Sequence, residues 1–384
     1  MISPGFKHND RMKFSRFIPV FFAAALLSLA CNPYDIEIPN HNNQQNNNNN
    51  TNKPGDSEQG GGEEDDTYPV KFPKAGGEKT KTLQTSGFFT ETKIKEGITL
   101  YQASRKKDDI TNAYQNVNVL EVDLNNEAYK INFVRTDRDS TTSAGRRFKA
   151  IAAINAAYEQ DASYIRVNGN PWSEVTIKPD DADPAKARRW WKHEAAIVGN
   201  GKRTVGIVHG ASGQKDITNG GIQALKIYKS LTEKHVFSSA PMLIDNYNPV
   251  GTKFVPSPYS EMTDSELKKN FNGEDYRCHQ GVRHPRTAVA LTEDNDILFI
   301  TVDGRFPGKA EGMDASELTK FIAKHFNPQW AINMDGGGST SMYLNGYGFP
   351  LNDIVNYPCD DGDGVWDQVG QRMLNTFFLV EYDE

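Results

Sequence analysis

The chain has 384 residues, with 43 Lys or Arg against 50 Asp or Glu, and its formal net charge is −7. This acidic balance argues against a nucleic-acid partner, because binding to a phosphate backbone requires a surplus of clustered positive charge. About 320 residues follow a low-complexity N-terminal part, a length that is long for one domain and short for three.

Residues 1–31 have the pattern of an export signal with a lipidation site. A basic stretch precedes the apolar run 17–29, and the small residue Ala30 comes directly before Cys31. The apolar run is too short for a good membrane span, so it is predicted to be a signal. Ser28 stands where a lipobox prefers Leu, and an ordinary cleaved signal with an incidental Cys is the alternative. We expect an exported cell-envelope lipoprotein, periplasmic or anchored at the outer membrane, that reaches the membrane only through lipid on Cys31.

Residues 32–66 are predicted to be a disordered tether. Asn and Gln fill most of 40–53, and Gly and acidic residues fill most of 55–66, so neither stretch can bury apolar surface. We expect the folded part to comprise a β-rich region at 67–149, packed on a larger domain at 150–384 that carries the site.

Two cysteines remain if Cys31 carries lipid. Exported proteins can form disulfides, and Cys278 and Cys359 are therefore predicted to pair. Two buried free thiols are the alternative.

Alternating apolar residues dominate the first half of the folded part. The runs 116–124 and 128–135 have a period of two and predict paired strands joined by a tight turn at Asn125-Asn126. A weak helical pattern at 142–149 precedes a buried strand end at 150–155. After an irregular surface segment at 171–194, further strands are predicted at 195–199, 204–209 and 222–229. The polar stretch 248–283 is predicted to be an insertion or a lid with one helix at 263–271.

The C-terminal part has the clearest periodicity. Strands at 286–294 and 296–304 are predicted to form a hairpin around Asn295. An amphipathic helix at 314–326 has Asp314 as its N-cap and Glu317 as the capping-box partner. Three more strands are predicted at 329–336, 339–346 and 372–383. We therefore predict an α+β fold with a mixed β-sheet flanked by helices, in which 296–335 form a C-terminal βαβ unit.

Two carboxylates end the strands of this βαβ unit. Asp303 ends the first strand and Asp335 ends the second. Parallel strands would place both at the same edge of the sheet, where ligands bind beyond the carboxyl ends of strands. Two neighbouring acids, one protonated and one ionised, are what the cleavage of an acetal requires. A cap or turn is the alternative role for each, above all for Asp303, which Gly304 follows.

The segment 335–341 reads DGGGSTS and is the most specific local signal in the chain. Consecutive glycines let backbone N–H groups converge on an anion, and Gly336 and Gly337 are followed by the hydroxyl donors Ser339 and Thr340. No Lys follows as in a P-loop, so no nucleotide is implied.

Arginines and asparagines lie beside these elements. A guanidinium can hold a phosphate through two parallel hydrogen bonds, and the candidates are Arg286, Arg305 and Arg372. Amides that could hold sugar hydroxyls belong to Asn155, Asn168 and Asn333. Solvated or ion-paired arginines and turn asparagines are the alternatives. Acids, an anion cradle and amides together suit a phosphorylated sugar better than a neutral glycan.

The sequence DGDGVWD at 361–367 spaces three carboxylates as in a calcium loop. They belong to Asp361, Asp363 and Asp367, and Gly364 is available for the turn. The Glu that closes a full EF-hand is absent, and an acidic surface turn is the alternative. The eight His residues are scattered, which argues against zinc. We expect no required cofactor, with calcium as a candidate ligand.

Six segments resemble, in the same order, those of the phosphodiester glycosidase family: AAINAAY (152–158), VNG (167–169), APMLIDN (240–246), HPRTAVALTEDNDILFITVDGR (284–305), AINMDGGGSTSMYLNG (331–346) and RMLNTFFLV (372–380). The resemblance covers roughly residues 150–380 and is most specific at DGGGS. It implies hydrolysis of a sugar–phosphate diester at the anomeric carbon, which releases the sugar and leaves the phosphate on the other alcohol.

The resemblance also implies which residues form the site. Motif positions are occupied by Asn155, Arg286, Asp303, Arg305, Asn333, Asp335, Gly336, Gly337, Ser339, Thr340 and Arg372. Relatives commonly carry a Gly-Gly-Phe-Phe-like run after the first Asn, whereas this chain has Ala156-Ala157-Tyr158-Glu159. Glu159 is therefore either a third carboxylate at the site or the mark of an altered substrate.

Two other functions stay open. One is a carbohydrate-binding envelope lipoprotein without turnover, in which Trp172, Trp190 and Trp191 stack on sugars. The other is a phosphodiesterase that cuts the P–O bond instead of the glycosidic C–O bond.

Overall fold

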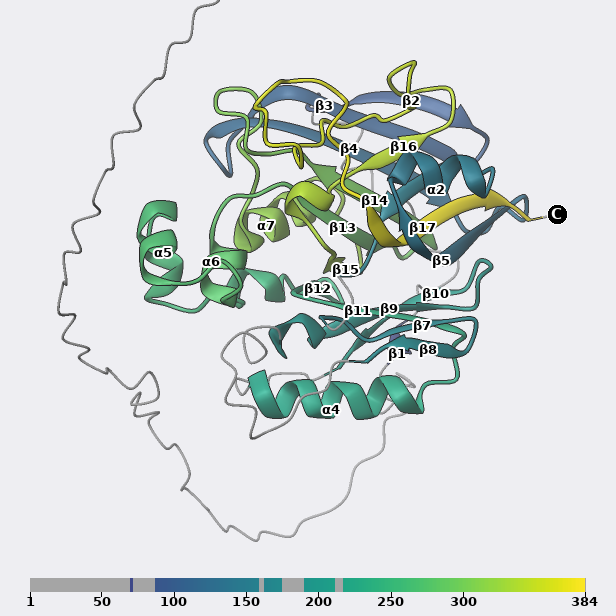
Figure 1. Ribbon diagram of the computed structural model, residues 1–384, viewed down its shortest axis with the longest axis horizontal. Coiled ribbons are helices and arrows are strands. Elements are labelled where there is room, and N and C mark those ends of the chain that lie inside the picture. The colour runs from purple at the N-terminus through teal and green to yellow at the C-terminus, as the bar shows by residue number, and fades with distance from the viewer. Residues whose placement is uncertain (1–69, 72–86, 159–161, 175–189, 211–216, 384) are drawn as a thin grey trace, which may run out of the picture. The chain divides into compact units, whose positions relative to one another are not determined.

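A computed structural model of the chain describes residues 70–71, 87–158, 162–174, 190–210 and 217–383 (Figure 1). The predictions for the export signal, Cys31, the tether and Glu159 lie outside these residues. Among the residues that are described, no helix is long and apolar enough to cross a membrane.

Three antiparallel sheets form the body of the molecule. The largest has seven strands in the order β12-β15-β13-β14-β4-β3-β2. In that order they span Met242–Asp245, Trp330–Asn333, Arg286–Leu291, Asp296–Val302, Ala113–Asp123, Ile98–Asp108 and Thr90–Lys95.

The other two sheets are smaller. The six-stranded sheet has the order β1-β10-β9-β11-β7-β8, and the four-stranded sheet has the order β16-β6-β17-β5. The six strands span Val70–Lys71, Val205–His209, Ala195–Gly199, His235–Ser239, Ile165–Val167 and Asn170–Ser173. The four strands span Met342–Leu344, Ala152–Asn155, Leu374–Tyr382 and Tyr129–Asp139.

Three helices each cover one sheet. Helix α7 (Ala315–His325) packs on the seven-stranded sheet, and its capping box of Asp314 and Glu317 forms as predicted. Helix α4 (Ile217–Ser230) covers the six-stranded sheet, and α2 (Thr141–Arg147) packs beside the four-stranded sheet (Figure 1). The remaining elements are α5 (Asp264–Asn270), α6 (Tyr276–Gly281) and the 3-10 turns Trp190–His193, Val250–Lys253, Tyr259–Glu261 and Gly337–Ser339.

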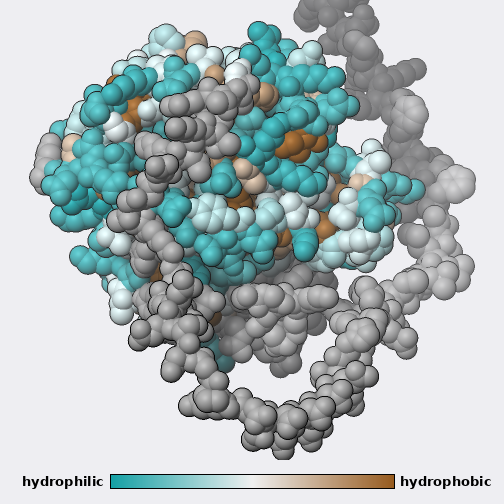
Figure 2. Space-filling model, turned by 180° about the vertical axis from the view of Figure 1, so that it is seen from behind, coloured by the Kyte–Doolittle hydropathy of each residue, from teal (hydrophilic) through white to brown (hydrophobic). Residues whose placement is uncertain are grey.

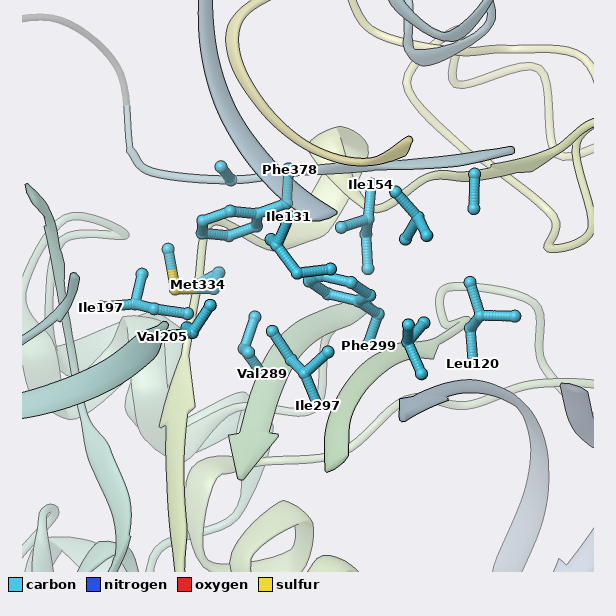
Figure 3. Packing of buried hydrophobic residues seen from close by; sticks show 14 of the residues in the cluster. Leu120, Ile131, Ile154, Ile197, Val205, Val289, Ile297, Phe299, Met334 and Phe378 are labelled. Atoms are coloured by element: carbon cyan, nitrogen blue, oxygen red, sulfur yellow. The ribbon is translucent and has the colours of Figure 1, made fainter. Parts of the chain in front are cut away.

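The main hydrophobic core lies where the three sheets meet. Phe299 of β14 and Phe378 of β17 stack with ring centroids 5.8 Å apart, although they belong to different sheets. Ile197 and Val205 bring the six-stranded sheet into the same cluster, and Met334 lies among them (Figure 3). The three sheets therefore share one interior. The face of the molecule shown in Figure 2 is mainly hydrophilic, with small separate hydrophobic areas.

The predicted mixed sheet is wrong, because every strand pairing among the described residues is antiparallel. Strands β14 and β15, which flank α7, do not pair with each other. Each pairs antiparallel with β13, which lies between them, so the two run in the same direction. The segment 296–335 therefore contributes two strands to the antiparallel sheet, and β13 lies between them.

Two local predictions also differ from the structure. The strands at 116–124 and 128–135 form, but they are not a hairpin: β4 pairs with β3 and β14, whereas β5 pairs with β17 of another sheet. The segment 222–229 is part of helix α4 rather than a strand. Its buried residues Ala224, Leu225 and Tyr228 are spaced to lie on one helical face, which covers the six-stranded sheet.

Candidate functional site

A pocket of about 390 Å³ opens beside the glycine turn that follows β15. Its charged lining consists of Lys192, Glu274, Arg286, Arg305, Asp335 and Arg372. The uncharged lining includes Tyr158, His279, His284 and the three glycines of the turn, Gly336, Gly337 and Gly338. The pocket thus brings together Asp335, the turn and all three predicted arginines.

The backbone of Asp335 is fixed from both sides. Its N–H donates to the carbonyl of Ala156 at 3.0 Å, and its carbonyl accepts from Asn155 Nδ2 at 2.7 Å. The Asp335 residue is 8% exposed and lines the pocket. Asn155 Oδ1 also accepts from Ser341 N at 3.1 Å. Asn155 is fully buried and does not line the pocket, so it positions the turn and is not the predicted sugar ligand.

Two glycines of the turn are required by packing or backbone conformation. A Cβ on Gly336 would lie 2.7 Å from the carbonyl oxygen of Pro285, whereas one on Gly338 would meet only the ends of the Asp360 and Arg372 side chains. Gly337 has a φ of +63°, which favours glycine. The N–H groups of Gly337, Ser339 and Thr340, however, donate to carbonyls of Pro285, Gly336 and Gly337. These three N–H groups are therefore not free to bind an anion in the way the sequence predicts.

Arg305 lies over this turn. It follows β14 with a φ of 68°, a strained conformation for a residue with a side chain. Its Nη2 lies 3.0 Å from the position that a Cβ on Gly337 would take. Among the described residues Arg305 has no ion-pair partner, and its one described hydrogen bond is a long contact of 3.9 Å from Nη1 to Cys359 Sγ. Its guanidinium is thus available to an anion in the pocket.

Arg372 is held by the protein on two sides. Its Nε donates to Asp360 Oδ1 at 2.6 Å, and its Nη1 donates to Ser339 Oγ at 3.0 Å. Ser339 and Thr340 are buried and do not line the pocket. Their hydroxyls therefore brace the turn, and the prediction that they bind substrate directly is not supported by this geometry.

Arg286 lies in the pocket wall, but its guanidinium donates hydrogen bonds to other groups of the protein. The residue is 1% exposed, and it donates to the carbonyls of Met313 (2.8 Å) and His279 (3.0 Å) and to Gln280 Oε1 (2.8 Å). Burial lowers the pKa of its guanidinium. Arg286 therefore fixes the end of α6 and adds positive potential, instead of making the predicted two-bond grip on a phosphate.

Tyr158 is a pocket residue to which the sequence assigned no role. Its Oη accepts from Asn333 Nδ2 and Gln280 Nε2, both at 3.2 Å, and donates to the Ala240 carbonyl at 3.2 Å. Burial raises the pKa of Tyr158, and the nearby charge of Asp335 raises it further. Asn333 is buried behind the pocket and orients Tyr158, so it does not hold a sugar hydroxyl. The one feature of the sequence that points to Tyr158 is the departure from the family pattern after Asn155.

Four further lining residues come from segments without clear periodicity. Lys192 Nζ pairs with Glu274 Oε2 at 2.9 Å and lies 4.5 Å from the ring centroid of Tyr158. His279 and His284 are also in the wall, and burial lowers the pKa of both, that of His284 to about 3. The two imidazoles are therefore neutral at physiological pH. No sequence pattern could have placed these side chains together.

Asp303 is not in the pocket lining, which contradicts its predicted catalytic role beside Asp335. It is fully buried, and its carboxylate accepts from Asn116 Nδ2 (2.7 Å), Asn356 Nδ2 (2.8 Å) and Tyr357 N (3.0 Å). Burial raises the pKa of Asp303 to about 7. Asn356 also donates to the Thr340 carbonyl at 3.1 Å, so Asp303 supports the turn from behind.

The Asp303 carboxyl should make stability depend on pH. The pKa of Asp303 is about 7 in the folded state, above the ordinary value of 3.8. Its contribution to the free energy of unfolding is therefore fully present below about pH 4 and is lost as the pH rises to 7. The loss is on the order of 4 kcal/mol. Asp303→Asn lacks this titration. We expect its deficit in free energy of unfolding, relative to the parent, to shrink as the pH rises from about 5 to about 8 in urea titrations. Parallel pH curves for the two proteins would contradict this.

Three predicted ligands are not in the pocket lining. Asn168 is exposed in the β7–β8 turn with a φ of 51°, which is its alternative role as a turn residue. Trp191 is 4% exposed and packs against Tyr158, with the two ring centroids 5.8 Å apart. It therefore supports the pocket wall instead of offering a surface on which a sugar could stack. Trp172 is half-buried and lies under the guanidinium of Arg135.

The acidic loop does not gather its carboxylates. Asp363 Oδ1 accepts from Val365 N at 2.7 Å, and Asp367 Oδ1 accepts from Val369 N at 2.9 Å. Asp361 lies against Gly370 instead. No group of three His, Cys, Asp or Glu side chains suited to a metal occurs in the described parts of the chain. The geometry is that of an acidic turn, and calcium binding stays a prediction.

The predicted disulfide is absent, and both cysteines are free. Cys278 lies on α6 in an apolar cluster with Leu267 and Val282, whereas Cys359 faces Arg305. The two thiols thus have different neighbours, and burial raises the pKa of each.

A model of the phosphodiester glycosidase family matches residues 148–381. No curated protein matches the sequence. Among solved structures, the chain is similar to the catalytic domain of zebrafish N-acetylglucosamine-1-phosphodiester alpha-N-acetylglucosaminidase, auto-inhibited by its pro-peptide, at 14% identity and a TM-score of 0.49 over 81% of this chain and 87% of that chain. It is also similar to a hypothetical protein from Synechocystis, at 12% identity and a TM-score of 0.45 over 76% of this chain and 63% of that chain.

Proposed function

Because the chain belongs to the phosphodiester glycosidase family, we propose that its pocket hydrolyses the glycosidic bond of a sugar-1-phosphodiester. The products are the free sugar and a phosphomonoester of the second alcohol. Family membership supports a hydrolase of this kind, and the pocket's own chemistry supports the choice of substrate.

The single observation that carries the proposal is the position of Arg305, over the glycine turn and in the same pocket as Asp335. The other cations are less available: Lys192 pairs with Glu274, and Arg372 pairs with Asp360. Among the described lining residues, Arg286 and Arg305 then remain as positive charges beside the negative charge of Asp335. This surplus of positive charge among the described residues favours an anionic group such as a phosphodiester.

Asp335 acts on the sugar side of the reaction. The bond between the anomeric carbon and the phosphate oxygen breaks, and its electron pair leaves with the phosphate. A water oxygen bonds to the anomeric carbon, and one of its protons passes to Asp335 and then to the phosphate. The carboxylate also stabilises positive charge that develops on the sugar ring.

One carboxylate suffices for this scheme. A phosphomonoester has a second pKa near about 6, so it departs without first taking a proton from a protein acid. Arg305 stabilises the charge that the leaving phosphate gains. The absence of Asp303 from the pocket lining therefore does not conflict with glycoside cleavage.

Hydrolysis in oxygen-18 water tests which bond breaks. A panel of sugar-1-phosphodiesters is incubated with the protein, and both products are analysed by mass spectrometry. We expect the label in the anomeric hydroxyl of the sugar. Label in the phosphate would instead identify a phosphodiesterase that cuts the P–O bond, and binding of glycans with no turnover across the panel would identify a binding lipoprotein.

A further inference from the structure

A second cavity of about 580 Å³ adjoins the pocket. The two share Arg305 and His284 in their linings, so these residues form the wall between them. The rest of the second cavity is built by the segment around α5, the loop before α7 and the N-terminus of α7. A group held by Arg305 can therefore have one substituent on each side of that side chain.

The second cavity carries more negative than positive charge. Arg283 is neutralised inside it by Glu317, with Nε to Oε2 at 2.9 Å and Nη2 to Oε1 at 2.5 Å. The carboxyls that remain belong to Asp264, Glu311 and Asp314, and Lys268 is the remaining cation apart from Arg305. Burial raises the pKa of Asp314 to about 6, but Asp264 and Glu311 alone still outnumber Lys268 once a bound phosphate neutralises Arg305. Ser260 and Thr263 add hydroxyl groups to the lining.

We propose that this cavity holds the alcohol that keeps the phosphate, and that it selects a neutral, hydroxyl-rich alcohol over an anionic one. The proposal rests on the function proposed above. The two ester oxygens of a phosphodiester diverge from the phosphorus. Once the sugar faces Asp335 and Arg305 holds the phosphate, the second alcohol extends past Arg305 into the adjoining cavity.

The chemistry of the cavity explains the selectivity. Carboxylate oxygens accept hydrogen bonds from hydroxyl groups, so sugars and polyols find partners there. An alcohol with its own carboxylate meets like charges within a Debye length, and repulsion disfavours it. The volume lies in the range of sites that bind ligands of sugar size or larger.

The test compares two phosphomonoesters as probes, glycerol 3-phosphate with a neutral alcohol and phosphoglycolate with an anionic one. Their dissociation constants are measured by calorimetry at low salt for the parent, for Glu311→Lys and for Asp137→Lys. Asp137 has a fully exposed side chain on β5, so its variant makes the same change in net charge without changing the cavity lining. We expect the parent to prefer glycerol 3-phosphate by about tenfold, and Glu311→Lys to reduce that preference by about tenfold.

Asp137→Lys should keep the parent's preference. The proposal is overturned if the parent shows no preference, if neither probe binds, or if Glu311→Lys and Asp137→Lys change the preference equally. Failure of the proposed function would show separately, as no turnover in the oxygen-18 experiment.

Discussion

Replacing Asp335 with Asn is expected to lower kcat on a sugar-1-phosphodiester by about a hundredfold or more. The substitution keeps the size of the side chain but removes the charge that stabilises the anomeric carbon and accepts a proton. The backbone contacts to Ala156 and Asn155 do not involve the carboxylate, so the turn should keep its conformation. KM should change much less, because Arg305 still holds the phosphate.

Asp360→Asn is the matched control for Asp335→Asn. It removes a carboxylate that pairs with Arg372 beside the turn, but Asp360 is not in the pocket lining. Its kcat should stay within about tenfold of the parent value, well short of the loss expected for a proton-transfer residue. A folded Asp335→Asn protein with full activity would remove Asp335 from the chemistry.

Replacing Arg305 with Ala is expected to lower kcat/KM by about a hundredfold or more. The variant loses a charge-assisted grip on the phosphate, and such contacts are the stronger class of hydrogen bond. Part of the loss should appear in KM and part in kcat, because the leaving phosphate gains charge in the transition state. Arg305→Lys keeps the charge without the planar fork and should recover only part of the activity.

Arg372→Ala is the comparison for Arg305→Ala. Arg372 is already paired with Asp360 and bonded to Ser339, so its removal should weaken binding less than removal of Arg305. Steady-state kinetics with one diester measure all of these variants, and thermal melting checks that each is folded. Equal losses for Arg305→Ala and Arg372→Ala would show that Arg305 has no special part in holding the phosphate.

Local patterns in the sequence predicted most of the elements around the site. The β13–β14 hairpin and the capping box of α7 depend on neighbours close in the chain, and both form as predicted. Which sheet a strand joins depends instead on the shared interior. Strand β4 has apolar residues on both faces, with Leu120 in the core between the sheets and Val119 in the cluster under α7. Strand β5 is also buried on two faces, so the apolar pattern alone does not show which sheet each strand joins.

The candidate site could be predicted only in part, because local patterns in the sequence do not encode tertiary contacts. The DGGGS turn places Asp335 and its glycines in the pocket because these residues are adjacent in the chain. The burial of Asp303 could not be predicted, because the direction of a strand gives the end at which a residue lies but not whether its side chain meets solvent. Lys192, Glu274 and His279 reach the pocket from short helical turns and a loop, whose tertiary contacts no local period in the sequence encodes.

Because β14 pairs with β4, the part of the chain that must fold together is longer than the part that the family model matches. The match begins at residue 148, yet seven positions of β14, from Asp296 to Val302, pair with residues 117–123. Asn116, next to that stretch, is one of the residues that hold the buried Asp303. A fragment cut at the start of the match would expose a long apolar strand edge, which is a template for aggregation. It would also lose a support of the turn at residues 335–341, so we expect the region before residue 148 to be needed for a stable fold with an intact pocket.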